Sequence, residues 1–129
     1  VPDGVRRARI HKSVKSIPSR AFRSRRSLIY VEFHDEIEII EESAFNCCFS
    51  LRGCIKLLGV KIVQNSAFRN CNDLTDVEFG DKLIAIDFAA FTNCFSLKTI
   101  SMPSVRIIGV QAFAYCYELS DVECGEDLE

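Results

Sequence analysis

"SAFRNC", residues 66–71, is one of four close copies of a six-residue stretch in this chain. The other copies are SAFNCC at 43–48, AAFTNC at 89–94 and QAFAYC at 111–116, and a fifth Ala-Phe pair stands at 21–22. The steps between successive pairs are 23, 23, 23 and 22 residues. Internal repetition at a fixed period of about 20 to 50 residues is typical of a solenoid, in which each repeat forms one coil.

The residues around each Ala-Phe pair repeat as well. A leucine stands seven residues after each repeated alanine, and three residues beyond it most copies have a short alternating stretch such as VEF at 31–33 or ISM at 100–102. This period-2 alternation predicts a strand with one buried face. Around Ala-Phe, Ser43, Ser66 or the IPS of 17–19 is placed to begin one or two helical turns. We therefore expect an α/β solenoid, with short parallel strands on one face and short helical turns or loops opposite.

The repeat phase extends to both ends of the chain. Ala8 matches Val31 at a distance of 23 residues, and Val122 begins a further coil that the chain does not complete. We expect a single domain over residues 1–129, with about five and a half coils and six short strands. The chain begins without Met, so we also expect it to be a piece of a longer array.

The repeat unit resembles the BspA-like leucine-rich repeat. Its pattern, L-x-x-I-x-L-P-x-x-V-x-x-I-x-x-x-A-F-x-x-C-x-x, is matched closely by LKTISMPSVRIIGVQAFAYC at 97–116. The resemblance implies a right-handed leucine-rich-repeat solenoid, with a parallel sheet on one face that is used for adhesion or protein recognition.

Two departures from the pattern lead to structural expectations. Arg25 replaces the repeated cysteine in the first copy, which suits an end coil that faces solvent. One extra residue lies between Leu51 and Ile55, because the other copies place three residues of spacing there and this one places four. An insertion in a period-2 segment exchanges its faces unless a bulge absorbs it. We expect such a bulge, with Ile55 and Leu57 inward and Lys56 outward.

Charge is divided unevenly along the chain. Residues 1–27 carry nine Lys and Arg against Asp3 alone, so their net charge is +8, while the whole chain is at −2. Such a basic end could attract nucleic acid, but aromatic residues are not interleaved with these arginines, which argues against that partner. No apolar run reaches the 18 or so residues that a membrane helix needs, so we expect no membrane insertion.

The seven cysteines do not form a disulfide or metal pattern. Four of them, at 48, 71, 94 and 116, follow the repeat and are expected to be small buried residues with weak S–H donors. Cys47, Cys48 and Cys54 lack the paired spacing of structural zinc sites, and we expect no metal and no cofactor. Unpaired thiols slightly favour an intracellular location, whereas the family resemblance allows a cell-surface one.

The sequence also lacks a nucleophile elbow, a phosphate loop and converging carboxylates, so we expect no enzyme activity. We expect a protein-interaction module that binds through its outward strand positions, with a basic protein as the partner. The alternative is a structural or adhesive segment of a longer cell-surface protein. A second candidate surface is an aromatic edge of Phe49, Phe95 and Tyr117. The residues predicted to bind the partner are Tyr30, Glu32, Asp76, Glu78, Asp121 and Glu123.

Overall fold

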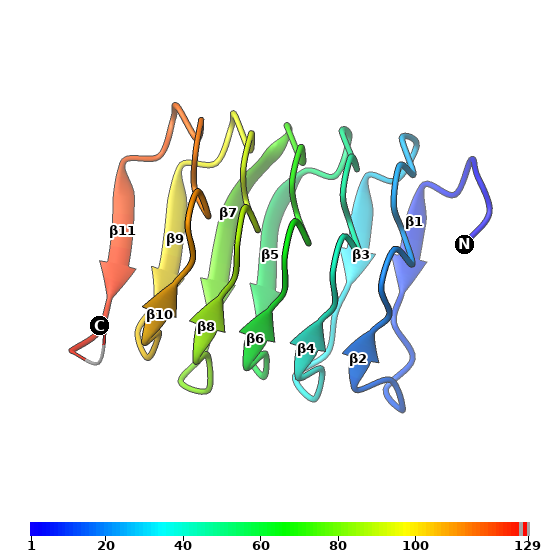
Figure 1. Cartoon of the computed structure of the whole chain (residues 1–129). Coiled ribbons are helices and arrows are strands. Elements are labelled where there is room, and N and C mark those ends of the chain that lie inside the picture. Colours follow the sequence, from blue (N-terminus) through cyan, green and yellow to red (C-terminus); the bar gives the residue numbers. More distant parts are fainter. Residues whose placement is uncertain (127, 129) are drawn as a thin grey trace.

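The chain folds as a stack of coils that carries parallel strands on two of its sides. The computed structural model describes residues 1–126 and 128. The longer strands form one side, and we number the coils one to six in their order (Figure 1). They are β1 (Arg7–Arg9), β3 (Tyr30–Glu32), β5 (Gly53–Leu57), β7 (Leu74–Phe79), β9 (Thr99–Met102) and β11 (Asp121–Cys124).

A second ladder of two-residue strands covers another side of the stack. Its strands pair in parallel in the order β10-β8-β6-β4-β2, so each coil meets only its neighbours (Figure 1). The repeated aliphatic residues lie here, and the inner residue of each strand from β2 to β8 is buried. These strands are β2 (Ser16–Ile17), β4 (Ile39–Ile40), β6 (Ile62–Val63), β8 (Ala85–Ile86) and β10 (Ile107–Ile108).

The outward ladder is interrupted between coils two and three. β1 pairs with β3, while β5, β7, β9 and β11 form a separate four-stranded sheet. Gly53 begins β5 with a φ of 82°, and the register against β7 shifts between Gly53 and Cys54. Ile55 and Leu57 are 4% and 1% exposed, and Lys56 is exposed. The predicted bulge is therefore confirmed, and it keeps the Lys56 ammonium in water, where burial would be costly.

The side that carries Ala-Phe contains no helix within residues 1–126, so the predicted helical turns do not form. Phe45 N–H donates to Ala67 O at 2.7 Å and Cys47 N–H to Arg69 O at 2.8 Å, so these groups bond between coils and not within a helix. The architecture is a parallel β-solenoid, and the α part of the α/β prediction is not supported. Two columns of non-glycine residues alternate the backbone here, with φ of 56° to 62° at Arg20, Ser43, Ser66, Ala89 and Gln111, and of 59° to 64° at Ser24, Cys47, Asn70, Asn93 and Tyr115.

A column of stacked phenylalanine rings fills the centre of the coils. Neighbouring rings lie 4.9 to 5.5 Å apart, with interplanar angles of 3° to 6°. As predicted, Phe45, Phe68 and Phe91 are fully buried, each with 0% of its surface exposed. The alanines beside them permit the close approach that stacking at this distance requires. We call this set the phenylalanine column, and its members are Phe22, Phe45, Phe68, Phe91 and Phe113.

The repeated cysteines line one corner of the core. Cys48 Sγ donates to Phe22 O at 3.0 Å, and the same bond recurs with Cys71, Cys94 and Cys116 at 3.1 to 3.3 Å. Cys48, Cys71 and Cys94 are buried, whereas Cys116 is half-buried in the fifth coil. All seven cysteines are free, and the prediction of small core residues with an S–H donor is confirmed for the three central copies.

Candidate functional site

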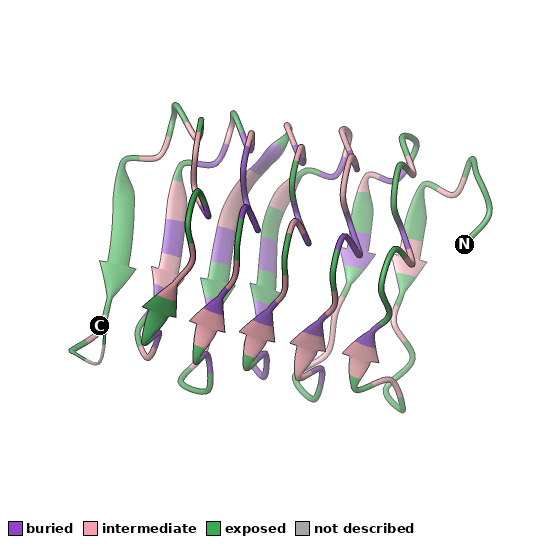
Figure 2. Cartoon of the chain, in the orientation of Figure 1, coloured by how far each residue is buried: buried purple, intermediate pink, exposed green. Residues whose placement is uncertain are grey.

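The outward positions of β1, β3, β5, β7, β9 and β11 form one continuous surface, which we call the outward strand face. Buried and exposed residues alternate along its central strands, so that the bands of Figure 2 separate core from surface. The register places equivalent residues of successive coils side by side, as in Arg7 with Tyr30 and Asp76 with Thr99. The face consists of Arg7, Arg9, Tyr30, Glu32, Cys54, Lys56, Asp76, Glu78, Thr99, Ser101, Asp121 and Glu123.

Four of the predicted site residues meet in one shallow groove over coils three to six. The groove has a volume of about 490 Å³, and its lining includes Asp76, Glu78, Asp121 and Glu123. The hydroxyls of Thr99 and Ser101 lie between these two pairs of carboxylates, because β9 runs between β7 and β11. The sequence prediction placed these acids on one face, and the structure gathers them at one end of it.

The other two predicted residues lie apart from this groove. Tyr30 and Glu32 line a separate hollow of about 250 Å³, together with Lys56 and Cys54 from β5. The interruption of the ladder between β3 and β5 separates the two hollows. The six predicted residues therefore belong to one face but to two different charge environments.

Hydrogen bonds hold the acidic groove in its charged form. Asp76 accepts hydrogen bonds from the hydroxyls of Thr99 and Thr75. These bonds, that of Thr99 first, lower the pKa of Asp76, because they stabilise the carboxylate and not the acid. Ser101 Oγ likewise donates to Glu123 Oε1. The groove thus presents fixed negative charge at neutral pH.

Arg7 and Arg9 also belong to the face, and the sequence prediction did not include them. Arg9 Nε lies 2.8 Å from Glu32 Oε2, and the Arg7 guanidinium lies 4.8 Å from the centre of the Tyr30 ring. The 23-residue offset that matches Ala8 to Val31 would have placed both arginines correctly. The outward strand face is therefore basic at its first coil and acidic at its last.

The aromatic edge is less continuous than the sequence suggests. Phe95 and Tyr117 stack at 5.8 Å and are 41% and 75% exposed, and Tyr115 meets Tyr117 edge-on at 6.1 Å. Phe49 is half-buried, and the Arg26 guanidinium covers it at 5.3 Å. Asn72 occupies the corresponding position between Phe49 and Phe95, so the edge consists of two separate aromatic groups.

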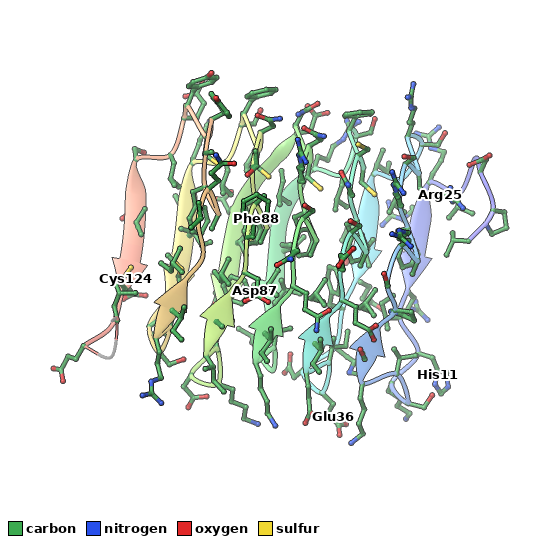
Figure 3. The ribbon with its side chains drawn as sticks, viewed as in Figure 1. His11, Arg25, Glu36, Asp87, Phe88 and Cys124 are labelled. Atoms are coloured by element: carbon green, nitrogen blue, oxygen red, sulfur yellow. The ribbon has the colours of Figure 1, made fainter. Side chains whose placement is uncertain are left out.

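The histidines hold neighbouring backbone. His34 Nε2 lies 3.1 Å from His11 O, and the Glu36 N–H donates to His34 Nδ1 at 3.1 Å. His11 and Cys124 lie at opposite ends of the stack (Figure 3). Among residues 1–126 and 128, no group of three or more His, Cys, Asp or Glu side chains is placed to hold a metal ion. The same residues include no helix long and apolar enough to cross a membrane.

The stacked coils, the parallel ladders and the repeat of Leu, Ala-Phe and Cys define a leucine-rich-repeat solenoid. A family model described as "BspA type Leucine rich repeat region" matches residues 4–120 in six copies. The chain therefore belongs to the BspA-type leucine-rich repeat family, and the fold it provides is a repeat scaffold.

Two solved structures support this assignment. The leucine-rich repeat protein TpLRR of T. pallidum is 29% identical, with a TM-score of 0.77 over 94% of this chain and 54% of that one. A leucine-rich repeat protein from Bacteroides ovatus ATCC 8483 is 22% identical, with a TM-score of 0.67 over 96% of this chain and 38% of that one. The chain thus spans about half the length of the first structure or less of the second. No curated protein sequence matches it significantly.

Proposed function

We propose that this chain is a non-catalytic scaffold whose outward strand face binds a protein partner. The observation that carries the proposal is the convergence of Asp76, Glu78, Asp121 and Glu123 in one groove of about 490 Å³. A group of fixed carboxylates attracts a basic surface and accelerates its association, and the effect falls as salt rises. The partner of this groove is therefore a protein that presents Lys or Arg side chains.

Rigidity of the face supports binding over a wide area. β7 is hydrogen-bonded to strands on both of its sides, so its side chains are already ordered before a partner arrives. A preorganised surface loses little conformational entropy on association. Tyr30 and Glu32 extend the contact area beyond the groove, across the second coil.

The chemistry of the groove favours recognition over catalysis. Its carboxylates accept hydrogen bonds from Thr75, Thr99 and Ser101, and Cys54 is the nearest thiol in the lining. Burial and the neighbouring Asp76 raise the pKa of Cys54, which keeps the thiol protonated and weakly nucleophilic. These groups lack the nucleophile, base and orienting partner that an acyl-transfer site needs.

The experiment replaces Glu78 and Glu123 with Lys and captures partners from native extract at two salt concentrations. We expect the captured proteins to be lost or their salt dependence to change. The matched control is Glu36→Lys with Asp81→Lys, which makes the same change in net charge at exposed loop positions (Glu36 is labelled in Figure 3).

An identical captured set in the strand-face variant and the wild type would refute the proposal. The stacked pair of Phe95 and Tyr117 would then be the next surface to test, through Tyr117→Ala. A captured set that ignores both substitutions would favour the alternative, a structural or adhesive repeat segment.

A further inference from the structure

The charges of the outward strand face are arranged so that the face complements itself. Each coil contributes an upstream and a downstream side chain, and the two halves of the stack have opposite signs. Coil one contributes Arg7 and Arg9, coil two Tyr30 and Glu32, coil three Cys54 and Lys56, coil four Asp76 and Glu78, coil five Thr99 and Ser101, and coil six Asp121 and Glu123. We propose that two copies of this chain associate through these faces, with coil one of each copy opposite coil six of the other.

A two-fold axis is what makes this arrangement possible. In a symmetric dimer of identical chains, the same patch is used twice and must be complementary to itself. An axis that lies between the two faces, parallel to the strands, reverses the order of the coils and keeps the strand direction. Each upstream side chain then faces an upstream side chain of the copy, and each downstream side chain faces a downstream one.

This axis brings opposite charges together at every charged coil pair but one. Arg7 faces Asp121 and Arg9 faces Glu123 where coil one meets coil six. Lys56 faces Glu78 where coil three meets coil four. Coils two and five bring Tyr30 against Thr99 and Glu32 against Ser101, and Glu32 already has Arg9 as its ionic partner at 2.8 Å.

The alternative two-fold axis gives the opposite result. An axis along the stack keeps the coil order, so each coil faces its own copy with the strands antiparallel. Arginines would then face arginines at coil one, and carboxylates would face carboxylates at coils four and six. Like charges at close range are repulsive, so the face favours one dimer and opposes the other.

Local contacts keep the charged groups of this face available. The Arg9 and Glu32 side chains are 82% and 49% exposed although they form an ion pair. Asp76 is held as a carboxylate by Thr75 and Thr99, and Tyr30 supports Arg7 from below. Two sheets that pack face to face keep their strands within about 30° of each other, which agrees with an axis parallel to the strands.

Exposed ion pairs are individually weak and strongly screened, so the dimer must be sensitive to salt. Analytical ultracentrifugation of the 129-residue chain at about 20 mM and about 500 mM NaCl measures this directly. We expect reversible dimers at low salt, with a dissociation constant at least about tenfold higher at high salt.

Two charge-reversed variants test the pairing. The first carries Arg7→Glu and Arg9→Glu, and the second carries Asp121→Lys and Glu123→Lys. Each variant alone has ends of one sign and should be monomeric at low salt, whereas an equimolar mixture should form a 1:1 heterodimer. The control, Lys12→Glu with Arg23→Glu, changes charge at exposed positions off the face and should dimerise as the wild type does.

The inference rests on the proposed function, and the outcomes separate the two. A wild type that stays monomeric at about 1 mM and low salt, or a mixture that stays monomeric, overturns self-pairing. The proposed function still stands in that case if capture of other proteins depends on Glu78 and Glu123. Dimers that survive in both single variants, together with unchanged capture, overturn the inference and the proposed function alike.

Discussion

The phenylalanine column and the outward strand face run through the same coils, yet they are built in opposite ways. The column repeats one side chain, and its rings stack at 4.9 to 5.5 Å from coil two through coil four with almost no variation in tilt. The outward strand face changes from Arg7 and Arg9 at one end to Asp121 and Glu123 at the other. Both regions are held by the same backbone register.

The difference separates what the fold requires from what it leaves open. A coil buries its apolar side chains only against its neighbours, so the inward positions must match in shape from coil to coil. The outward positions contact water, and the fold places no such demand on them. Variation there is consequently where recognition can be encoded, and the predictions below test this division.

The largest effect is expected from the centre of the column. Phe68→Ala should lower the free energy of unfolding by about 3–5 kcal/mol, because it leaves a cavity between Phe45 and Phe91. Urea denaturation followed by circular dichroism measures the change. Phe95→Ala, which removes a 41% exposed ring, is the control and should cost less than about 1 kcal/mol.

A similar loss from Phe68→Ala and Phe95→Ala would show that core and surface rings contribute equally, and the comparison would fail. Phe22→Ala refines it further. Phe22 has a stacked neighbour on one side only, Phe45 at 4.9 Å, so its loss should fall between the two.

The buried thiols provide the next effect, which depends on pH. Burial raises the pKa of Cys48 to about 12 and also raises the pKa values of Cys71 and Cys94. Above about pH 9 the unfolded chain loses these protons while the folded chain keeps them, so the unfolded state binds fewer protons. Stability that is fully present below pH 9 should therefore fall as pH rises toward 12, by about 1 kcal/mol per thiol per pH unit.

Denaturation at a series of pH values under reducing conditions measures this slope. Cys71→Ser keeps a donor for Phe45 O and removes one titrating thiol, so the slope should fall by about a third. Cys124→Ser is the control at an exposed position. A slope that Cys71→Ser does not change would contradict the assignment of these thiols to the core.

The repeat in the sequence predicted most of the core because shape matching forces it. The stacked rings, the buried cysteines and the bulge before Ile55 all follow from keeping equivalent residues at equivalent heights. The helical turns were wrong because Ser66 and Asn70 adopt φ of 58° and 64°, and neither residue announces a left-handed backbone in the sequence. The two-residue strands were missed because a strand such as Ile62–Val63 is too short to show alternation.

The candidate site was harder to predict because its residues do not repeat. Asp76, Glu78, Asp121 and Glu123 were found through their strand positions, which the register fixes. Their separation from Tyr30 depends on the break between β3 and β5, which only the paired strands reveal. Arg7 and Arg9 lay within reach of the same phase argument, since the alternation around Ala8 continues that around Val31.

A smaller stabilising effect is expected where one coil departs from its neighbours. Asn93 Nδ2 donates to Asn70 Oδ1 at 2.8 Å, while Asn70 Nδ2 has only the weak acceptor Cys47 Sγ at 3.4 Å. Asn tolerates a left-handed φ better than most residues, and Cys47 has a φ of 63°. Cys47→Asn should extend this ladder and raise the free energy of unfolding by about 0.5–1 kcal/mol. Thermal unfolding measures it, and Cys47→Ala, which has no side-chain acceptor, should bring no gain.

The smallest effect is expected on the outward strand face itself. Glu78→Lys with Glu123→Lys should change the free energy of unfolding by less than about 0.5 kcal/mol, because both side chains are exposed and their partners are replaced by water. Urea denaturation at moderate salt, which screens Lys56 beside position 78, measures the change. A loss of 2 kcal/mol or more would mean that the face supports the fold, since surface substitutions seldom have that effect. A change near zero instead makes any loss of partner capture in the same variant a measure of recognition, because the scaffold beneath the face is intact.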